Sequence, residues 1–218
     1  QHAPAAVDAS ARRVLVLADR ARQIRRGGSF DEDAHHALAR EAAEQGAVLL
    51  QNDGLLPLAA SGRVAVIGAM AKTPRYQGAG SSHINPTRLS GALEALPGVI
   101  AALGASPDIV YAPGCDDAGD TTDALLAEAA RAARGADAAV VFAGLPDRCE
   151  SEGFDREDLQ MPEGHLRMIE AVAAANVNTA VVLLCGGAVE CPWADKVRAV
   201  LYMGLPGQAG GEAAANLL

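Results

Sequence analysis

The fold class is decided by the stretch Ala138-Ala139-Val140-Val141-Phe142-Ala143-Gly144. It is a continuous apolar run of strand length, without the alternation of apolar and polar residues that marks a strand with one solvated face. Runs of this kind are typical of parallel strands covered by helices on both faces. The segment Arg63–Gly68 has the same character. We therefore predict an α/β fold with a buried, mostly parallel sheet.

Outward from this stretch, helical and strand-like segments alternate along the chain. Strands are predicted over 47–50, 63–68, 108–111, 138–144, 179–185 and 199–203. Helices are predicted over 7–25, 31–45, 87–96, 121–134 and 163–175, with a last one near 211. This order predicts about five to six strands with helices on both faces, a three-layer sandwich. Residues 1–46 are interpreted as linker helices, and residues 47–218 as the sandwich domain.

Composition and charge exclude several classes of function. Half of the 218 residues are apolar, only two are lysines, and the formal net charge is −9, so a nucleic-acid partner is not expected. The arginines of the first helix are interpreted as a solvated or docking face; they are Arg12, Arg13, Arg20, Arg22, Arg25 and Arg26. No membrane span or signal peptide is found. A soluble chain is expected, with localisation open and the cytoplasm favoured.

The cysteines lack the spacing of a metal site. Cys115, Cys149, Cys185 and Cys191 form no C-x-x-C pair, so neither a metal nor a cofactor is predicted. Cys149 has no histidine beside it in the sequence, which disfavours it as a nucleophile.

Two loops follow predicted strands and carry the polar chemistry. The acidic loop, Glu150-Ser151-Glu152-Gly153-Phe154-Asp155-Arg156, follows the strand over 138–144. The serine loop, Gly78-Ala79-Gly80-Ser81-Ser82, lies in the long segment after the strand over 63–68. Both leave carboxyl ends of strands, which places them on the rim where such sheets bind ligands. The acidic loop is either an acid–base site or a solvated, self-paired charge run. Nucleotide binding is disfavoured, because the glycines come too late after the strand.

Several segments together carry a resemblance to a known family. They are Ala42–Leu58, Val64–Gly68, Gly78–Ser82, Tyr111–Cys115, Glu150–Arg156 through Leu159 and Pro162, Val189–Trp193 and Pro206–Gly211. In this order they resemble the C-terminal α/β sandwich domain of glycoside hydrolase family 3, the β-glucosidase family. Gln51 stands where that family usually carries lysine.

The resemblance implies a retaining β-glycosidase with exo-acting, β-glucosidase-like hydrolysis of terminal sugars. In that family an aspartate on an N-terminal barrel is the nucleophile, and a glutamate on a loop of this domain is the acid–base residue. Glu152 matches this position, with Glu150 as the alternative. The expected partners are the barrel domain and a small glycoside or oligosaccharide.

Further roles are expected for neighbouring residues. Arg75, Ser81 and Ser82 are candidates for binding sugar hydroxyls. Gly153, Asp155 and Arg156 are expected to structure the acidic loop.

The chain lacks the family's barrel, its nucleophile motif and its last sandwich strand, so it is expected to be a truncated fragment, inactive alone. A non-catalytic α/β module that binds sugar or protein is the alternative. The sequence does not specify the sugar, the linkage or the oligomeric state.

Overall fold

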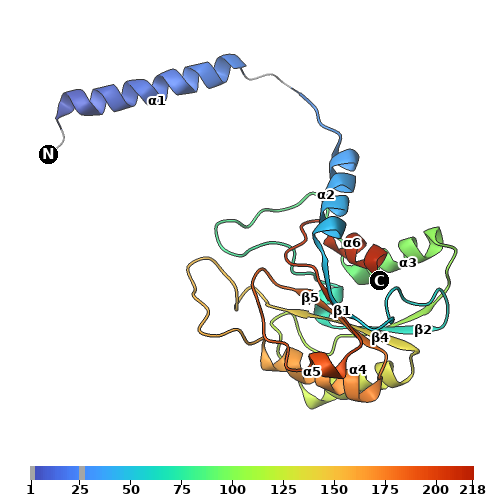
Figure 1. Ribbon diagram of the computed structural model, residues 1–218. Coiled ribbons are helices and arrows are strands. Elements are labelled where there is room, and N and C mark those ends of the chain that lie inside the picture. The colour runs from blue at the N-terminus through green and yellow to red at the C-terminus, as the bar shows by residue number, and fades with distance from the viewer. Residues whose placement is uncertain (1–2, 25–27) are drawn as a thin grey trace. The chain divides into compact units, whose positions relative to one another are not determined.

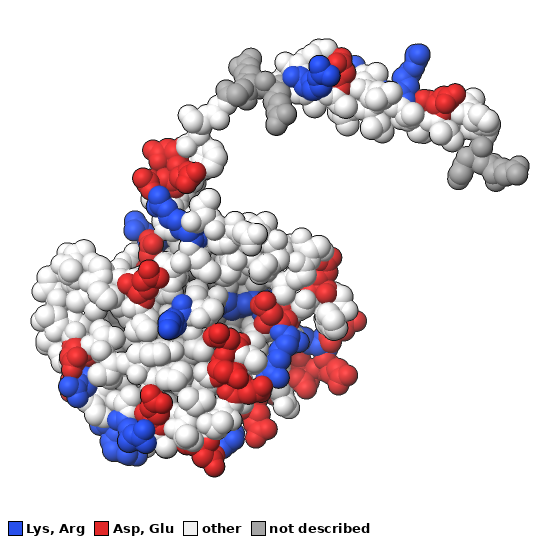
Figure 2. Space-filling model, turned by 180° about the vertical axis from the view of Figure 1, so that it is seen from behind, with Lys and Arg blue, Asp and Glu red and all other residues white. Residues whose placement is uncertain are grey.

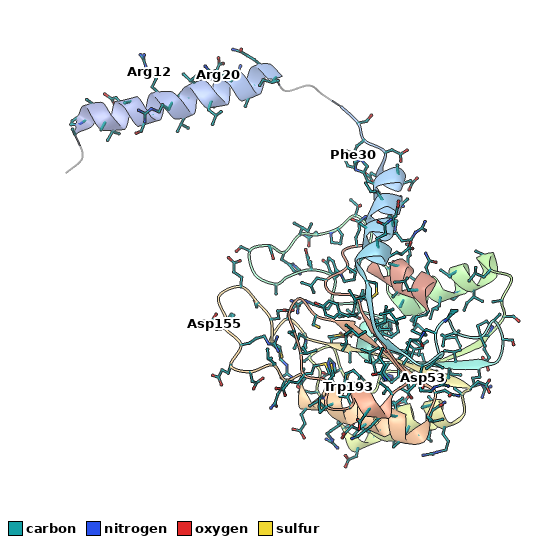
Figure 3. The ribbon with its side chains drawn as sticks, in the orientation of Figure 1. Arg12, Arg20, Phe30, Asp53, Asp155 and Trp193 are labelled. Carbon is teal, nitrogen blue, oxygen red and sulfur yellow. The ribbon has the colours of Figure 1, made fainter. Side chains whose placement is uncertain are left out.

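A computed structural model describes residues 3–24 and 28–218, in two compact units, Gln1–Glu32 and Asp33–Leu218. The first unit contains α1 (Pro4–Ile24), whose residues are all exposed (Figure 1). It confirms the first predicted helix. Arg12 and Arg20 lie on α1 (Figure 3), whereas Arg25 and Arg26 fall outside the described residues. No helix among residues 3–24 and 28–218 is both long enough and apolar enough to cross a bilayer.

The second unit is built on a six-stranded sheet with the order β1-β6-β5-β4-β2-β3. Its strands are β1 (Val48–Asn52), β2 (Arg63–Ile67), β3 (Asp108–Ala112), β4 (Ala138–Gly144), β5 (Thr179–Leu184) and β6 (Ala199–Tyr202). All neighbouring strands pair in parallel except β1, which pairs antiparallel with β6 at one edge. The predicted α/β class with a mostly parallel sheet is confirmed.

Helices cover both faces of the sheet (Figure 1). The helices α2 (Glu32–Gly46), α3 (Ala92–Ala102) and α6 (Gly210–Leu217) contribute to one core, and α4 (Asp123–Arg134) and α5 (Glu163–Ala175) to the other. Alternate residues of strand β4 belong to the two cores. Val140 and Phe142 pack in the first core, and Val141 and Ala143 pack in the second. Every residue of β4 is buried, which is why its sequence is apolar throughout.

The helices α3 and α4 begin later than predicted. The helix expected over 87–96 lies instead at Ala92–Ala102, after the N-cap residue Gly91. A Cβ at Gly91 would lie 2.5 Å from the Lys72 carbonyl oxygen, so a close backbone approach requires glycine at this cap. Helix α4 is capped by Thr122, whose hydroxyl oxygen accepts a hydrogen bond from the Leu125 amide. The expected cap, Thr121, instead donates to the Gly114 carbonyl at 2.6 Å.

Candidate functional site

The acidic and serine loops meet beyond the carboxyl ends of β4 and β2, which are neighbours in the sheet. Ser151 and Ala79 form a parallel β-bridge that joins the two loops. Between them lies an open pocket of about 670 Å³. Its lining residues are Gly78, Ala79, Ser81, Ser82, Glu150, Ser151, Glu152, Phe154, Asp155 and Arg156.

Acidic and basic side chains lie intermixed on the surface of the domain (Figure 2).

Glu152 is exposed at this pocket and contacts the serine loop. One carboxylate oxygen, Oε2, accepts a hydrogen bond from the Ser81 amide at 2.7 Å and another from the Ser81 hydroxyl. The Glu152 amide donates to the Ala79 carbonyl at 3.3 Å. The other carboxylate oxygen, Oε1, has no hydrogen-bond partner among the described residues.

Gly80 makes this approach of the two loops possible. Its φ is +87°, and a Cβ there would lie 2.6 Å from the Cβ of Glu152. Glycine meets both demands, the positive φ and the lack of space. Ser82 is exposed and lines the same pocket.

Glu150, two residues earlier, is directed into the domain. Its Oε2 accepts a hydrogen bond from the Gly186 amide at 2.8 Å and lies 3.9 Å from the Arg75 guanidinium. Its side chain is 23% exposed. Both glutamates line the pocket, but their partners differ: Glu150 contacts the Gly186 amide and the buried Arg75, whereas the more exposed Glu152 contacts Ser81.

Arg75 is buried beneath the acidic loop. Its guanidinium donates to the backbone carbonyls of Gln77, Leu145 and Glu150, each at 2.8 Å, and lies 3.1 Å from a carboxylate oxygen of Asp147. Its side chain is 5% exposed. These contacts direct the guanidinium to the protein interior, so it does not present free donors to a sugar in the pocket.

The far end of the acidic loop is attached by Arg156, which donates to the Ala188 carbonyl at 2.9 Å. Gly153 has a φ of +84° and open space around it, so the backbone conformation, and not crowding, favours glycine there. Asp155 lies exposed at the outer edge of the loop (Figure 3).

Sequence reasoning missed two features of the site. Phe154 is 75% exposed at the pocket, an unusual position for a phenyl ring. The Gly186 turn (Gly186–Ala188), directly after β5, receives both Glu150 and Arg156. The paired glycines at the end of a buried strand were the available indication of a close approach.

The buried thiols are poor candidates for nucleophiles. Burial raises the pKa of Cys185 to about 12 and that of Cys115 to about 11, so both thiols stay protonated near neutral pH. All four cysteines are free. Within the described ranges, no group of three or more His, Cys, Asp and Glu side chains is placed to hold a metal ion.

Comparison with known proteins identifies relatives of the whole domain. The family described as "Glycosyl hydrolase family 3 C-terminal domain" matches residues 47–218. "Thermostable beta-glucosidase B" of Acetivibrio thermocellus is 52% identical over 191 residues, which cover 87% of this chain and 25% of that protein. "Exo-alpha-(1->6)-L-arabinopyranosidase" of Bifidobacterium longum is 40% identical, with coverage of 99% and 30%.

A solved structure agrees with this assignment. The "GH3 beta-glucosidase" of Bifidobacterium adolescentis matches with a TM-score of 0.81 and 44% sequence identity. The match covers 91% of this chain and 29% of that one. The chain thus spans between a quarter and a third of the length of these relatives. It belongs to glycoside hydrolase family 3, with residues 47–218 forming the C-terminal domain of that family.

Proposed function

We propose that this chain is the acid–base-bearing domain of a retaining, exo-acting β-glycosidase, and that Glu152 is the acid–base residue. The observation that carries the proposal is the different placement of the two candidate glutamates. Glu152 is exposed at a pocket on the ligand-binding rim of the sheet, whereas Glu150 is held by Gly186 and Arg75. Proton transfer requires a carboxyl group within reach of the glycosidic oxygen, and Glu152 meets this requirement better.

In the proposed reaction, Glu152 protonates the oxygen of the leaving group while a carboxylate from another domain attacks the anomeric carbon. The resulting glycosyl–enzyme ester is then hydrolysed by a water molecule that Glu152 deprotonates. The two carboxyl groups of a retaining site lie about 5 Å apart. A preceding barrel domain of the same polypeptide is the proposed source of the nucleophile, as family membership suggests.

The remaining pocket residues receive supporting roles. Ser82 and the Ser81 hydroxyl are proposed to contact sugar hydroxyls once substrate enters, and Phe154 offers an apolar surface to the leaving group. Arg75 is now proposed to hold the acidic loop instead of contacting substrate, because its donors are used by backbone carbonyls. Arg156 holds the other end of the loop.

The identity of the sugar is proposed to depend on other parts of the polypeptide. Relatives similar to this chain are named for glucosides, for arabinopyranosides and, in Aspergillus terreus, as a "Probable exo-1,4-beta-xylosidase". One kind of acid–base domain therefore occurs beside different sugar specificities. The chain alone is expected to be inactive, since it would supply the proton but not the nucleophile.

The test is the dependence of hydrolysis on the leaving group in the full-length polypeptide. Glu152→Gln removes the proton donor, so kcat/KM for alkyl glycosides should fall by roughly 10²- to 10⁴-fold. Dinitrophenyl glycosides need no protonation, and their glycosylation step should be nearly unchanged. The control is Glu157→Gln, an exposed acid of the neighbouring sequence that does not line the pocket. Full activity with both Glu150 and Glu152 replaced would instead favour a non-catalytic binding module.

A further inference from the structure

The acidic loop is attached to the segments that follow β2 and β5, the two strands that flank β4 in the sheet. On the β2 side, Ser151 bridges Ala79 and Glu152 contacts Ser81. On the β5 side, the loop is attached to the Gly186 turn by the carboxylate of Glu150. The carboxylate of Glu152 therefore lies on a segment with attachments on both sides, one of which is made by the Glu150 side chain.

The Gly186 turn is shaped to receive the Glu150 carboxylate. A Cβ at Gly186 would lie 2.9 Å from Glu150 Oε1, and a Cβ at Gly187 would lie 3.3 Å from the same atom. The Cys185 carbonyl just before the turn accepts a hydrogen bond from the Tyr202 hydroxyl at 2.9 Å. The turn thus has an amide that donates to the Glu150 carboxylate, two residues without side chains, and a preceding carbonyl held by Tyr202. These features suit the binding of a carboxylate.

The positive charge of Arg75 also holds Glu150. The Arg75 guanidinium donates to the Glu150 carbonyl at 2.8 Å and lies 3.9 Å from the Glu150 carboxylate. The same guanidinium also binds the Leu145 carbonyl, just past the end of β4. Main chain and side chain of Glu150 are therefore held by one buried cation that is itself anchored to the sheet.

We propose that Glu150 is the positioning residue for Glu152. By bridging the Gly186 amide and Arg75, it fixes the start of the acidic loop, so that the carboxyl group two residues later stays in reach of the leaving-group oxygen. This inference rests on the proposed acid–base role of Glu152 and extends it. In this proposal the two acids of the Glu-Ser-Glu sequence have different roles: Glu150 positions the loop, and Glu152 transfers the proton.

The contact between the Glu150 carboxylate and the Gly186 amide is tested by amide hydrogen exchange of the 218-residue chain. Glu150→Ala should speed exchange of the Gly186 amide and of the acidic loop by at least ~10-fold, because the amide loses its acceptor. The control is Glu190→Ala, which removes an exposed carboxylate nearby whose side chain has no hydrogen bond or ion pair with the described residues. Unchanged exchange at Gly186 in Glu150→Ala would overturn the proposal.

The consequence for catalysis is tested in the full-length polypeptide. In Glu150→Ala, kcat/KM for alkyl glycosides should fall by roughly 10- to 100-fold. For dinitrophenyl glycosides the loss should stay under about threefold, because a misplaced acid slows only those reactions in which the leaving group must be protonated. Glu150→Gln should recover most of the loss, since its carboxamide oxygen still accepts from Gly186. Equal losses on both substrate types would mean a purely structural role and would overturn the proposal.

A second variant covers the case in which Glu150→Ala does not fold. Gly186→Ala leaves both glutamates in place but puts a methyl group 2.9 Å from the Glu150 carboxylate, so it should show the same selective loss. A Gly186→Ala enzyme with unaltered leaving-group dependence would contradict the positioning role.

Glu152→Gln, measured alongside, separates the two claims. If it lacks leaving-group dependence, the proposed function fails. If it shows this dependence while both Glu150→Ala and Gly186→Ala do not, only the positioning role fails.

Discussion

At the scale of single residues, buried polar groups determine the shape of the acidic loop. Arg75 satisfies three backbone carbonyls at once and lies near the carboxylates of Asp147 and Glu150. A guanidinium suits this place because its donors form a rigid planar fork that stays charged. The loop therefore depends on a cation that is hardly accessible to solvent.

Replacing Arg75 by methionine should destabilise the domain by about 2–4 kcal/mol, because carbonyl acceptors would stay buried without donors. The control is Arg167→Met, which removes an ion pair between Arg167 and Asp123 whose two side chains are 43% and 95% exposed. Such a surface pair contributes less than about 1 kcal/mol. Urea denaturation of both variants gives the comparison, and equal losses would contradict the role assigned to Arg75.

His165 predicts a pH dependence of stability. Its side chain is fully buried beside the Gly144 carbonyl, with Nδ1 2.9 Å from that oxygen, and burial lowers its pKa below the ordinary value of 6.5. Below about pH 6.5 the unfolded chain binds a proton that the folded chain does not. The free energy of unfolding should therefore fall as the pH drops below 6.5, by at most about 1.4 kcal/mol per pH unit from this group.

The measurement is urea denaturation between pH 5 and 7 of the wild type, His165→Gln and His83→Gln. The exposed His83 serves as the matched control. The acid-side slope should become shallower only in His165→Gln. An equal slope in all three proteins would show that His165 does not cause the effect.

Both glutamates of the acidic loop could be located from the sequence, but the different partners of their carboxylates could not. Glu150 and Glu152 are the same residue type in the same loop, so the local sequence does not distinguish them. Gly186, the partner of Glu150, lies 36 positions away, and Ser81, the partner of Glu152, lies 71 positions away. The sequence likewise offers Arg75 as a candidate for binding sugar hydroxyls, since the Leu145 carbonyl that its guanidinium contacts lies 70 positions away. Only the folded sheet brings these groups together.

At the scale of elements, a glycine inside a helix marks a close approach of the backbone at one position and not at another. A Cβ at Gly164, in α5, would lie 2.2 Å from the carbonyl oxygen of Gly119. Gly98, in α3, has no other atom within 4 Å of the position a Cβ would occupy. Both glycines lie in helices, but their tertiary surroundings differ.

Alanine substitution at these two positions should have opposite effects. Gly98→Ala should stabilise the domain by about 0.5–1 kcal/mol, because alanine has the higher helix propensity. Gly164→Ala should destabilise it by about 1–3 kcal/mol, because the methyl group overlaps a backbone carbonyl that cannot rotate away. Thermal unfolding decides the comparison, and a stabilising Gly164→Ala would contradict the described packing of α5.

Elements were predictable where local sequence determines them. The buried strands β2 and β4 follow from apolar runs, and α5 follows from helical spacing. The helix predicted over 87–96 lies at Ala92–Ala102, and its N-cap Gly91 packs against the Lys72 carbonyl, a tertiary contact without a local signal. The antiparallel edge pairing of β1 with β6 was likewise not specified by the pattern of strand β1.

At the scale of the whole molecule, the domain presents its pocket on one rim of a sheet and matches relatives three to four times longer. The general fold and the family were predictable because motifs along most of the chain keep the family's order. The complete reaction was not, since the nucleophile proposed for it belongs to another domain. The account therefore assigns this chain one carboxyl group of a two-carboxylate site.

The most direct test of that assignment is product analysis of full-length Glu152→Gln and Glu150→Gln enzymes supplied with a dinitrophenyl β-glycoside and azide. Without its base, the Glu152→Gln enzyme should accumulate the glycosyl–enzyme ester, which the small anion azide attacks in place of activated water. We predict faster turnover with azide and a β-glycosyl azide, identified by NMR, from Glu152→Gln alone. A β-glycosyl azide formed by Glu150→Gln and not by Glu152→Gln would contradict the assignment of Glu152.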